Sequence, residues 1–244
     1  EAAHCVGREC MFPLRDTVRS ITRPFVTWGL IAISVAVFAL ERSLPSPLFD
    51  QLVYGYGLVP ARLSLSDATS WLNLVTSIFL HGGWLHLISN LWMLFIFGDN
   101  VEDRMGHGRF LGFYLLSGVV AGLAHALLDP TSTLPTIGAS GAIAGVLGAY
   151  FVLFPSARVL TLVPLIILPW LVEIPAFIYL GIWFLTQVSS GLLSLGAAGA
   201  FGGIAWWAHI GGFAFGALAG LSFIRRPRRA SPAVYDLEFP PRYS

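Results

Sequence analysis

The chain has 244 residues, of which 56% are hydrophobic and 11% charged, and its mean hydropathy is +0.75. Soluble domains carry about 25% charged residues, so this composition excludes an ordinary soluble protein and predicts an all-α membrane protein with several spans. The net charge is only +1 and all fourteen basic residues are arginines, so we expect no nucleic-acid partner.

The first segment, residues 1–24, contains four arginines and is expected to be a cytoplasmic N-terminal tail. His4, Cys5 and Cys10 raise the alternative of a metal site, but three ligands in so short a segment do not make a structural zinc site. We therefore expect no metal and no cofactor. The uncharged run 25–40 is the first predicted span, and it lacks the small-residue pattern of a cleaved signal peptide.

Residues 41–70 form a connection of mixed charge that is rich in proline, glycine and aromatic residues. It is too long for a tight turn and too apolar for a free linker, which predicts an interfacial structure lying on the membrane. The uncharged run 68–98 is longer than one span needs, and the glycine pair 82–83 interrupts it. We therefore expect the second span to begin near Trp84 and end near Phe97.

A short polar turn at 99–109 precedes the third predicted span, residues 110–128. The fourth span is expected at 138–154, after a turn rich in Thr, Ser and Pro. The next apolar stretch, 159–172, has only fourteen residues and contains two prolines. That length predicts a re-entrant or interfacial segment rather than a span.

No charged residue occurs from Ile174 to Ile224, which leaves room for two more spans. The segment 189–203, rich in Gly, Ser and Ala, separates them. The fifth span is therefore expected at about 174–188 and the sixth at about 204–224.

The positions of the arginines predict on which side of the membrane the two termini lie. Four arginines follow the last span and match the basic N-terminal segment, so both ends should be cytoplasmic and the number of spans even. We expect a six-span domain at 25–224 and a cytoplasmic tail at 225–244. The tail's arginines favour contact with lipid headgroups, and a partner protein for the tail stays open.

Ser140 stands between glycines in Gly138-Ala139-Ser140-Gly141, at the head of the fourth span. At a helix start the backbone N–H groups can face an anion, and the helix dipole is positive. The glycines remove side-chain bulk, so another backbone can approach. Because most buried serines only bond back to the preceding turn, this motif indicates a nucleophile only if partners lie elsewhere in the chain.

Such partners are expected on the second and sixth spans, which run in the same direction as the fourth. His86 and Asn90 are four residues apart, and so lie on one face of the second span. His209 lies about five residues into the sixth span. The first turns of these spans share one depth, so we expect these three side chains at the level of Ser140, below the outer surface.

Small residues predict close packing between the fourth and sixth spans. Gly141 and Gly145 line one side of the fourth span, and the sixth carries a glycine at every fourth position: Gly212, Gly216 and Gly220. Rows of small residues let helix backbones approach closely in lipid. A serine–histidine hydrogen bond of about 2.6–3.2 Å requires that approach.

The arrangement predicts nucleophilic catalysis by a Ser-His dyad. His209 would take the proton of Ser140, and the Ser140 backbone N–H with the side chains of Asn90 and His86 would stabilise the oxyanion. No acidic residue in the spans is placed to orient the histidine. Ionisable groups in spans can simply pair with one another, but polar groups at this depth are costly and functional by default.

The other histidines fit structural roles better. We expect His125, in the third span, to be a hydrogen-bonded core residue, and His107 to belong to the cytoplasmic turn. His81 lies five residues before His86, off its helical face, and is interpreted as a support of the outer loop.

With these residues, the chain resembles the rhomboid family of intramembrane serine proteases. The similarity runs from about Met11 to Ile224 and rests on motifs that look like the family's HxxxN, ExRxG turn, GxSG and AHxxGxxxG. In this chain they are His86 with Asn90, Glu102 to Gly106, Gly138 to Gly141, and Ala208-His209 with Gly212 and Gly216.

The resemblance implies a six-transmembrane-helix bundle of rhomboid type, with an interfacial first loop and a cavity open to the outer side. It implies Ser140 as nucleophile, His209 as base, and Asn90, His86 and the Ser140 amide as oxyanion hole. Substrates would be transmembrane proteins cut near the outer face, entering past the fifth span and residues 189–203. We expect the protein in the bacterial cytoplasmic membrane.

Two positions depart from the family pattern. The Trp-Arg pair often found in the family's first loop is Trp71-Leu72 in this chain. Some members have a tyrosine that stacks on the histidine, four positions after the serine, and this chain has Ala144 there. Neither residue belongs to the dyad, so we expect an active enzyme.

Other functions stay as alternatives. A proteolytically silent relative could act as a chaperone or binding partner of membrane proteins, but such relatives usually lose the serine or the histidine. A transporter would show matching internal repeats, and a zinc protease would carry HExxH, which is absent.

Overall fold

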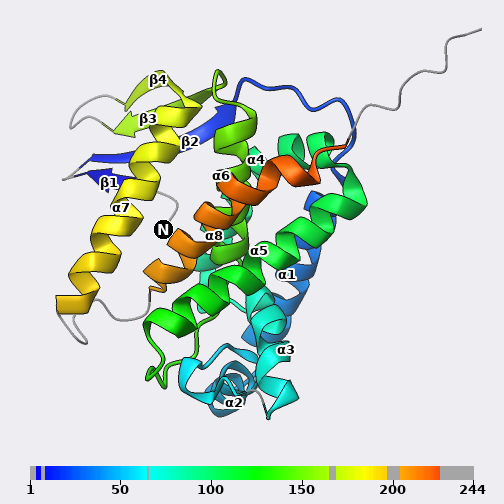
Figure 1. Ribbon diagram of the computed structural model, residues 1–244, viewed down its shortest axis with the longest axis vertical. Coiled ribbons are helices and arrows are strands. Elements are labelled where there is room, and N and C mark those ends of the chain that lie inside the picture. The colour runs from blue at the N-terminus through cyan, green and yellow to red at the C-terminus, as the bar shows by residue number, and fades with distance from the viewer. Residues whose placement is uncertain (1–3, 7–8, 65, 165–168, 197–203, 226–244) are drawn as a thin grey trace, which may run out of the picture.

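The computed structural model describes residues 4–6, 9–64, 66–164, 169–196 and 204–225 (Figure 1). A bundle of helices makes up most of it, and α6 lies at its centre, with every residue from Gly141 to Tyr150 buried. Its helices are α1 (Phe25–Ser43), α4 (Trp84–Met105), α5 (His107–Leu128), α6 (Ser140–Leu153), α7 (Ala176–Gly196) and α8 (Trp206–Ala219), which the short helix η3 (Gly220–Phe223) extends.

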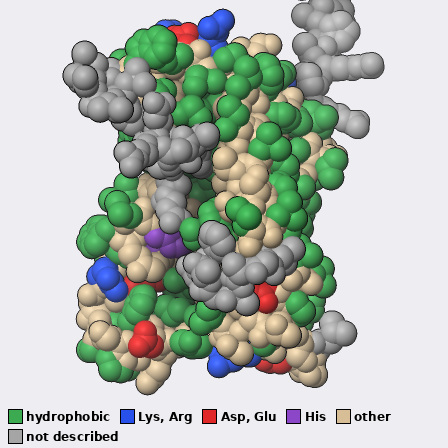
Figure 2. Space-filling model, turned by 90° about the vertical axis from the view of Figure 1, so that its left-hand side faces the viewer, with side chains coloured by type: hydrophobic (Ala, Val, Ile, Leu, Met, Phe, Trp, Pro, Cys, Tyr) green, Lys and Arg blue, Asp and Glu red, His purple; other side chains and the backbone are tan. Residues whose placement is uncertain are grey.

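Length and composition identify the membrane helices. Among the described residues, α1, α5 and α7 are long and apolar enough to cross a membrane, and α4 with the helical segment before it would add a fourth span bent by 83°. Large apolar side chains are exposed on many helices, and they cover much of the face in Figure 2, with charged side chains toward the two ends. The protein is therefore a multi-pass integral membrane protein.

Each predicted span overlaps one of these helices, but several lengths differ, and α7 continues to Gly196, beyond the end expected near residue 188. The second helix begins at Trp84 as predicted but continues to Met105, so the polar turn expected at 99–109 shrinks to Gly106, whose φ is 80°. Helices α6 and α8 have 14 residues each, or about 21 Å, less than the ~30 Å core of a bilayer.

The polar residues at the end of α4 stay within the helix, and the side chain of Glu102 among them binds the start of α1. The buried carboxylate of Glu102 accepts hydrogen bonds from the backbone N–H groups of Val26 (2.9 Å) and Thr27 (2.8 Å), and from the Thr27 hydroxyl (2.7 Å). Its other contact is with His107 Nδ1 at 2.6 Å. Glu102 thus satisfies the free donors at the start of α1 and ties α1 to α4.

The connection expected to lie on the membrane, 41–70, contains short helices packed against one end of the bundle (Figure 1). They are α2 (Ser46–Tyr56), η1 (Pro60–Arg62), α3 (Ala68–Thr76) and η2 (Ser77–Phe79). Asp67 caps α3 by accepting from the hydroxyl of Thr69 at 2.6 Å and from its N–H at 2.9 Å, and these two bonds, the hydroxyl's first, lower the pKa of Asp67 below its usual value.

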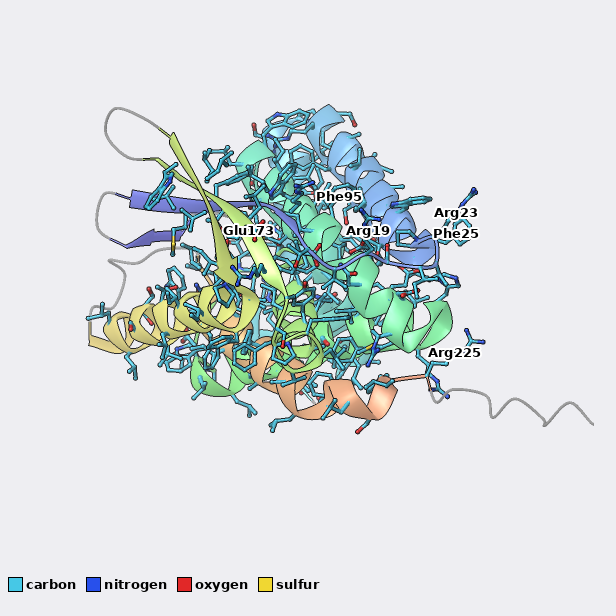
Figure 3. The ribbon with its side chains drawn as sticks, turned by 90° about the horizontal axis from the view of Figure 1, so that it is seen from above. Arg19, Arg23, Phe25, Phe95, Glu173 and Arg225 are labelled. Carbon is cyan, nitrogen blue, oxygen red and sulfur yellow. The ribbon has the colours of Figure 1, made fainter. Side chains whose placement is uncertain are left out.

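The all-α prediction is wrong at the opposite end of the bundle, where four antiparallel strands form a sheet in the order β1-β2-β3-β4. Their bounds are β1 (His4–Val6), β2 (Glu9–Asp16), β3 (Arg158–Pro164) and β4 (Pro169–Pro175). Seen from that end, the sheet and α7 project to one side, away from Arg23 and Arg225 (Figure 3).

Two segments form this sheet. The apolar stretch 159–172, expected to be re-entrant or interfacial and not a span, forms the arms of a β-hairpin, and the N-terminal tail 1–24 contributes the other two strands. Short apolar runs fit a strand as well as a buried helix, and prolines end both arms at Pro164 and Pro169. The side chains of residues 1–10, including the three candidate metal ligands, lie outside the description, as does most of the tail 225–244.

Candidate active site

Ser140 is the first residue of α6, and the turn before it is held in place on both sides. The N–H of Gly138 donates to the carbonyl of Ser77 at 2.9 Å, and Gly138 has a φ of 123°, a conformation that glycine adopts without strain. A Cβ at Gly138 would lie 2.5 Å from Nε2 of His86. The motif therefore needs its first glycine to bring the serine turn against His86.

Ser140 and His209 are in hydrogen-bonding contact, with 2.8 Å between the serine Oγ and the histidine Nε2. Ser140 comes from the first turn of α6, and His209 is the fourth residue of α8. These side chains are 69 positions apart in sequence, so the contact depends on the packing of the two helices.

Glycines allow this packing. A Cβ on Gly212 would lie 2.2 Å from the carbonyl oxygen of Gly141, and one on Gly216 would lie 1.9 Å from that of Gly145. On the reverse side of the contact, a Cβ on Gly148 would lie 2.1 Å from the carbonyl oxygen of Phe213. The backbones of α6 and α8 thus touch along their length, as the spacing of the glycines predicts.

The sequence prediction missed a further partner of His209. Nδ1 of His209 lies 2.8 Å from Oε1 of Gln187 on α7, and Gln187 is only 5% exposed. The prediction considered only acidic residues as partners of the histidine. Gln187 is a polar residue within the uncharged run 174–224. A polar side chain in such a run was the sequence signal that could have pointed to a partner of the histidine.

Aromatic rings flank the imidazole of His209. The Trp183 ring centroid lies 6.1 Å from it, and the Trp206 ring meets it edge-on at 6.2 Å. Trp183 precedes Gln187 by four residues and so lies on the same face of α7. Ala144 on α6 has no ring, and the rings near the imidazole come from α7 and α8, one tilted and one edge-on.

The expected oxyanion donors lie near this turn, but they are not equally placed. His86 packs against Gly138, as described above. The side-chain amide of Asn90 donates to the carbonyl of His86 at 2.7 Å, within its own helix. Among the described residues, no hydrogen bond joins Asn90 to Ser140, and the amide nitrogen of Asn90 carries a second N–H besides the one that it donates to His86.

The remaining histidines lie outside the dyad. The N–H of His81 donates to the carboxylate of Glu41 at 3.1 Å, and its ring lies 5.2 Å from that of His86. His107 binds Glu102. The expectation for His125 was a hydrogen-bonded core residue, but its buried Nδ1 has no partner within the described part of the chain.

A small cavity of about 30 Å³ adjoins Ser140, which is large enough to hold a water molecule. Its walls come from α5, α6, α8 and the loops before α4 and α6, and small residues predominate in them, among them Ser77, Gly118, Ala121, Gly122, Gly138 and Ala208. In the described ranges, no group of three His, Cys, Asp or Glu side chains could hold a metal ion.

Comparison with known proteins finds a matching family model and several similar proteins. The family model of the Rhomboid domain matches residues 68–226. The mitochondrial rhomboid protein 1 of Saccharomyces cerevisiae is 30% identical over 199 residues, covering 80% of this chain and 52% of that protein. The chain therefore spans about half the length of this relative.

Two proteins of Bacillus subtilis are also similar. YdcA is 32% identical over 143 residues, which cover 57% of this chain and 68% of YdcA. The rhomboid protease GluP is 35% identical over 127 residues, 52% of this chain and 24% of GluP.

Proposed function

The chain belongs to the rhomboid family, whose domain model covers residues 68–226, and from this premise we propose that it is an intramembrane serine endopeptidase. Ser140 is the nucleophile and His209 the general base, in a dyad that cuts transmembrane segments of membrane proteins near the outer face. The observation that carries the proposal is the 2.8 Å contact between Ser140 Oγ and His209 Nε2.

The chemistry follows the general scheme of serine hydrolases. Nε2 of His209 takes the hydroxyl proton as Ser140 Oγ attacks the carbonyl carbon of the scissile bond, and the imidazolium then protonates the leaving amine. Water hydrolyses the acyl-enzyme with His209 again as base. The Ser140 N–H and the side chains of Asn90 and His86 bind the oxyanion, each donor contributing about 3–4 kcal/mol.

We propose that six spans cross the membrane between cytoplasmic termini, within a protease domain at 25–224. Contacts at the sheet end support this topology, because segments that it assigns to the cytoplasm bind one another there. The N–H of Thr17 donates to the carbonyl of Arg158, and that of Arg225 to Arg104, each at 3.0 Å.

Contacts between the segments assigned to the outer side give matching support. Leu58 pairs with Thr136, and the N–H of Ala61 donates to the carbonyl of Ser132 at 3.0 Å. With an odd number of spans, the two segments joined by at least one of these contacts would lie on opposite sides of the bilayer. The bacterial cytoplasmic membrane stays our prediction for the location.

The substrates proposed are single transmembrane helices that unwind easily. A helix must expose its scissile carbonyl to Ser140, and unwinding costs least where glycine, proline or other weak helix formers occur. Entry past α7 and residues 189–203 is proposed from the family resemblance, and 197–203 lie outside the described residues. The tail 225–244 is proposed to contact lipid headgroups.

The test is cleavage of a single-span substrate by the purified protein in liposomes, together with covalent labelling by a fluorophosphonate. Ser140→Ala and His209→Ala should abolish cleavage. Ser117→Ala is the matched control, because it removes a buried hydroxyl from α5 and should leave cleavage intact. Cleavage that survives Ser140→Ala would disprove the mechanism. A wild-type protein that neither cleaves nor labels would favour a silent binding partner.

A further inference from the structure

Gln187 binds His209 on the side of the imidazole that faces away from Ser140. Its Oε1 lies 2.8 Å from Nδ1 of His209, while Nε2 of the same ring faces the serine hydroxyl at 2.8 Å. Gln187 is a buried residue of α7, so its amide must find its partners within the protein.

Neighbouring groups on α7 fix which end of the Gln187 amide faces His209. The amide nitrogen lies 3.3 Å from the carbonyl oxygen of Trp183, and a carbonyl oxygen can only accept. The Thr186 hydroxyl donates its proton to the Trp183 carbonyl at 2.6 Å. The oxygen of that hydroxyl can therefore accept a hydrogen bond from the Gln187 amide nitrogen, which lies 3.2 Å away. The reverse orientation would place two acceptors together, so Oε1 must face His209.

The orientation of the amide determines the tautomer of the histidine. An amide oxygen only accepts, so Nδ1 of His209 must carry the proton and donate to Gln187. In the neutral ring, Nε2 is then an acceptor, which is the form that can receive the Ser140 proton. The other tautomer would leave a donor pointing at the serine and a buried amide oxygen without its hydrogen bond.

We propose that Gln187 is a positioning residue that holds His209 in the tautomer and ring orientation needed to deprotonate Ser140. The inference rests on the proposed function and deepens it, because the dyad becomes a serine, a histidine and a neutral acceptor. Aspartate has this role in soluble serine proteases, and an amide can replace it without placing a charge inside the membrane, where an unpaired carboxylate is costly.

The same contact makes the dyad depend on the position of α7. Trp183 and Gln187 lie on one face of that helix, and both contact His209. A displacement of α7 away from α8 therefore removes both the ring and the acceptor from the imidazole. Ser140 and the rest of the α6–α8 contact would be unaffected.

Three variants of the full-length protein test the proposal by the rate of fluorophosphonate labelling of Ser140. Gln187→Met keeps the size of the side chain and removes the acceptor, and it should label roughly ten times more slowly, the loss expected for one hydrogen bond. Gln187→Glu in its neutral acid form keeps both contacts, because its hydroxyl can donate to the Trp183 carbonyl and its carbonyl oxygen can accept from His209, and it should label within about threefold of wild type. Ser43→Ala, the control, removes an exposed hydroxyl on α1 that donates to the carbonyl of Leu40, and should label as wild type.

The second readout is the ¹⁵N spectrum of histidine-labelled protein, with the His209 signals assigned by their loss in His209→Ala. The wild-type protein should show His209 protonated at Nδ1, and Gln187→Met should show a mixture of tautomers. Slower labelling with an unchanged His209 spectrum, or labelling of Gln187→Met at the wild-type rate, would overturn the proposal. If Gln187→Met does not fold, slow labelling by a folded Gln187→Glu overturns it as well. A wild-type protein that fails to label contradicts the proposed function instead, and the spectrum still decides whether Gln187 sets the tautomer.

Discussion

Replacing Gly216 by alanine tests whether close contact of α6 and α8 creates the active site. The added Cβ would lie 1.9 Å from the carbonyl oxygen of Gly145, whereas a carbon atom approaches such an oxygen to about 3.3 Å. The obstruction is backbone, which cannot rotate away. The helices must therefore separate by more than about 1 Å at this level.

That separation has two measurable effects. Forcing an extra methyl group into a packed interface costs about 1–3 kcal/mol, so Gly216→Ala should lower the unfolding temperature. The Ser140–His209 contact of 2.8 Å would also lengthen beyond hydrogen-bonding distance. Misplacement of a reacting group by about 1 Å costs on the order of 100-fold in rate, so labelling by a fluorophosphonate should slow by about that factor.

Two alanine variants in the same fold serve as comparisons. Gly112, on α5, has no atom of the described residues within 4 Å of an added Cβ, and the nearest such atom to a Cβ on Gly220 is 2.9 Å away, on Ala149. Gly112→Ala should behave as wild type, and Gly220→Ala should show an intermediate loss of stability with nearly normal labelling. A Gly216→Ala protein with wild-type stability and labelling rate would refute the close-packing argument.

Three further changes have defined outcomes. Asn90→Ala should lower substrate turnover by about 100-fold, through loss of an oxyanion donor, with little change in unfolding temperature; a larger effect on stability than on rate would contradict the assigned role. Glu102→Gln should lower the free energy of unfolding by about 2–3 kcal/mol, since the buried donors of α1 lose a charged acceptor, and hydrogen exchange at Val26 and Thr27 should speed up. Burial raises the pKa of Asp16 from 3.8 to about 6, so the folded state binds the proton more tightly than the unfolded state. The free energy of unfolding should therefore fall, by about 2 kcal/mol, as the pH rises from about 4 to about 6, and Asp16→Asn should remove this part of the pH dependence; an Asp16→Asn protein with the same pH dependence as the wild type would exclude it.

The helices could be predicted because their signals are local. Runs of uncharged residues, a glycine pair before Trp84 and the glycine spacing on α6 and α8 are all visible in short windows of sequence. The contact between Ser140 and His209 was also within reach, because parallel spans of similar length place their first turns at one depth.

The role of Gln187 was out of reach for a different reason. Its face of α7 points to His209 only because of how α7 is rotated against α8, and the uncharged run around it gives no sign of that rotation. The search for an acidic partner was too narrow, since an amide oxygen accepts a hydrogen bond as a carboxylate does. The rings of Trp183 and Trp206 depend on the same packing.

The sequence by itself determined the membrane class, the family, the approximate position of each long helix and which serine and histidine to look for in contact, because hydropathy and motif spacing act over one helix at a time. Only the tertiary structure decided that β2 pairs with β3 and that α7 supplies the partner of the histidine. Strand pairing and helix rotation depend on contacts between segments distant in the chain, and the free energy of those contacts is distributed over many residues of both partners.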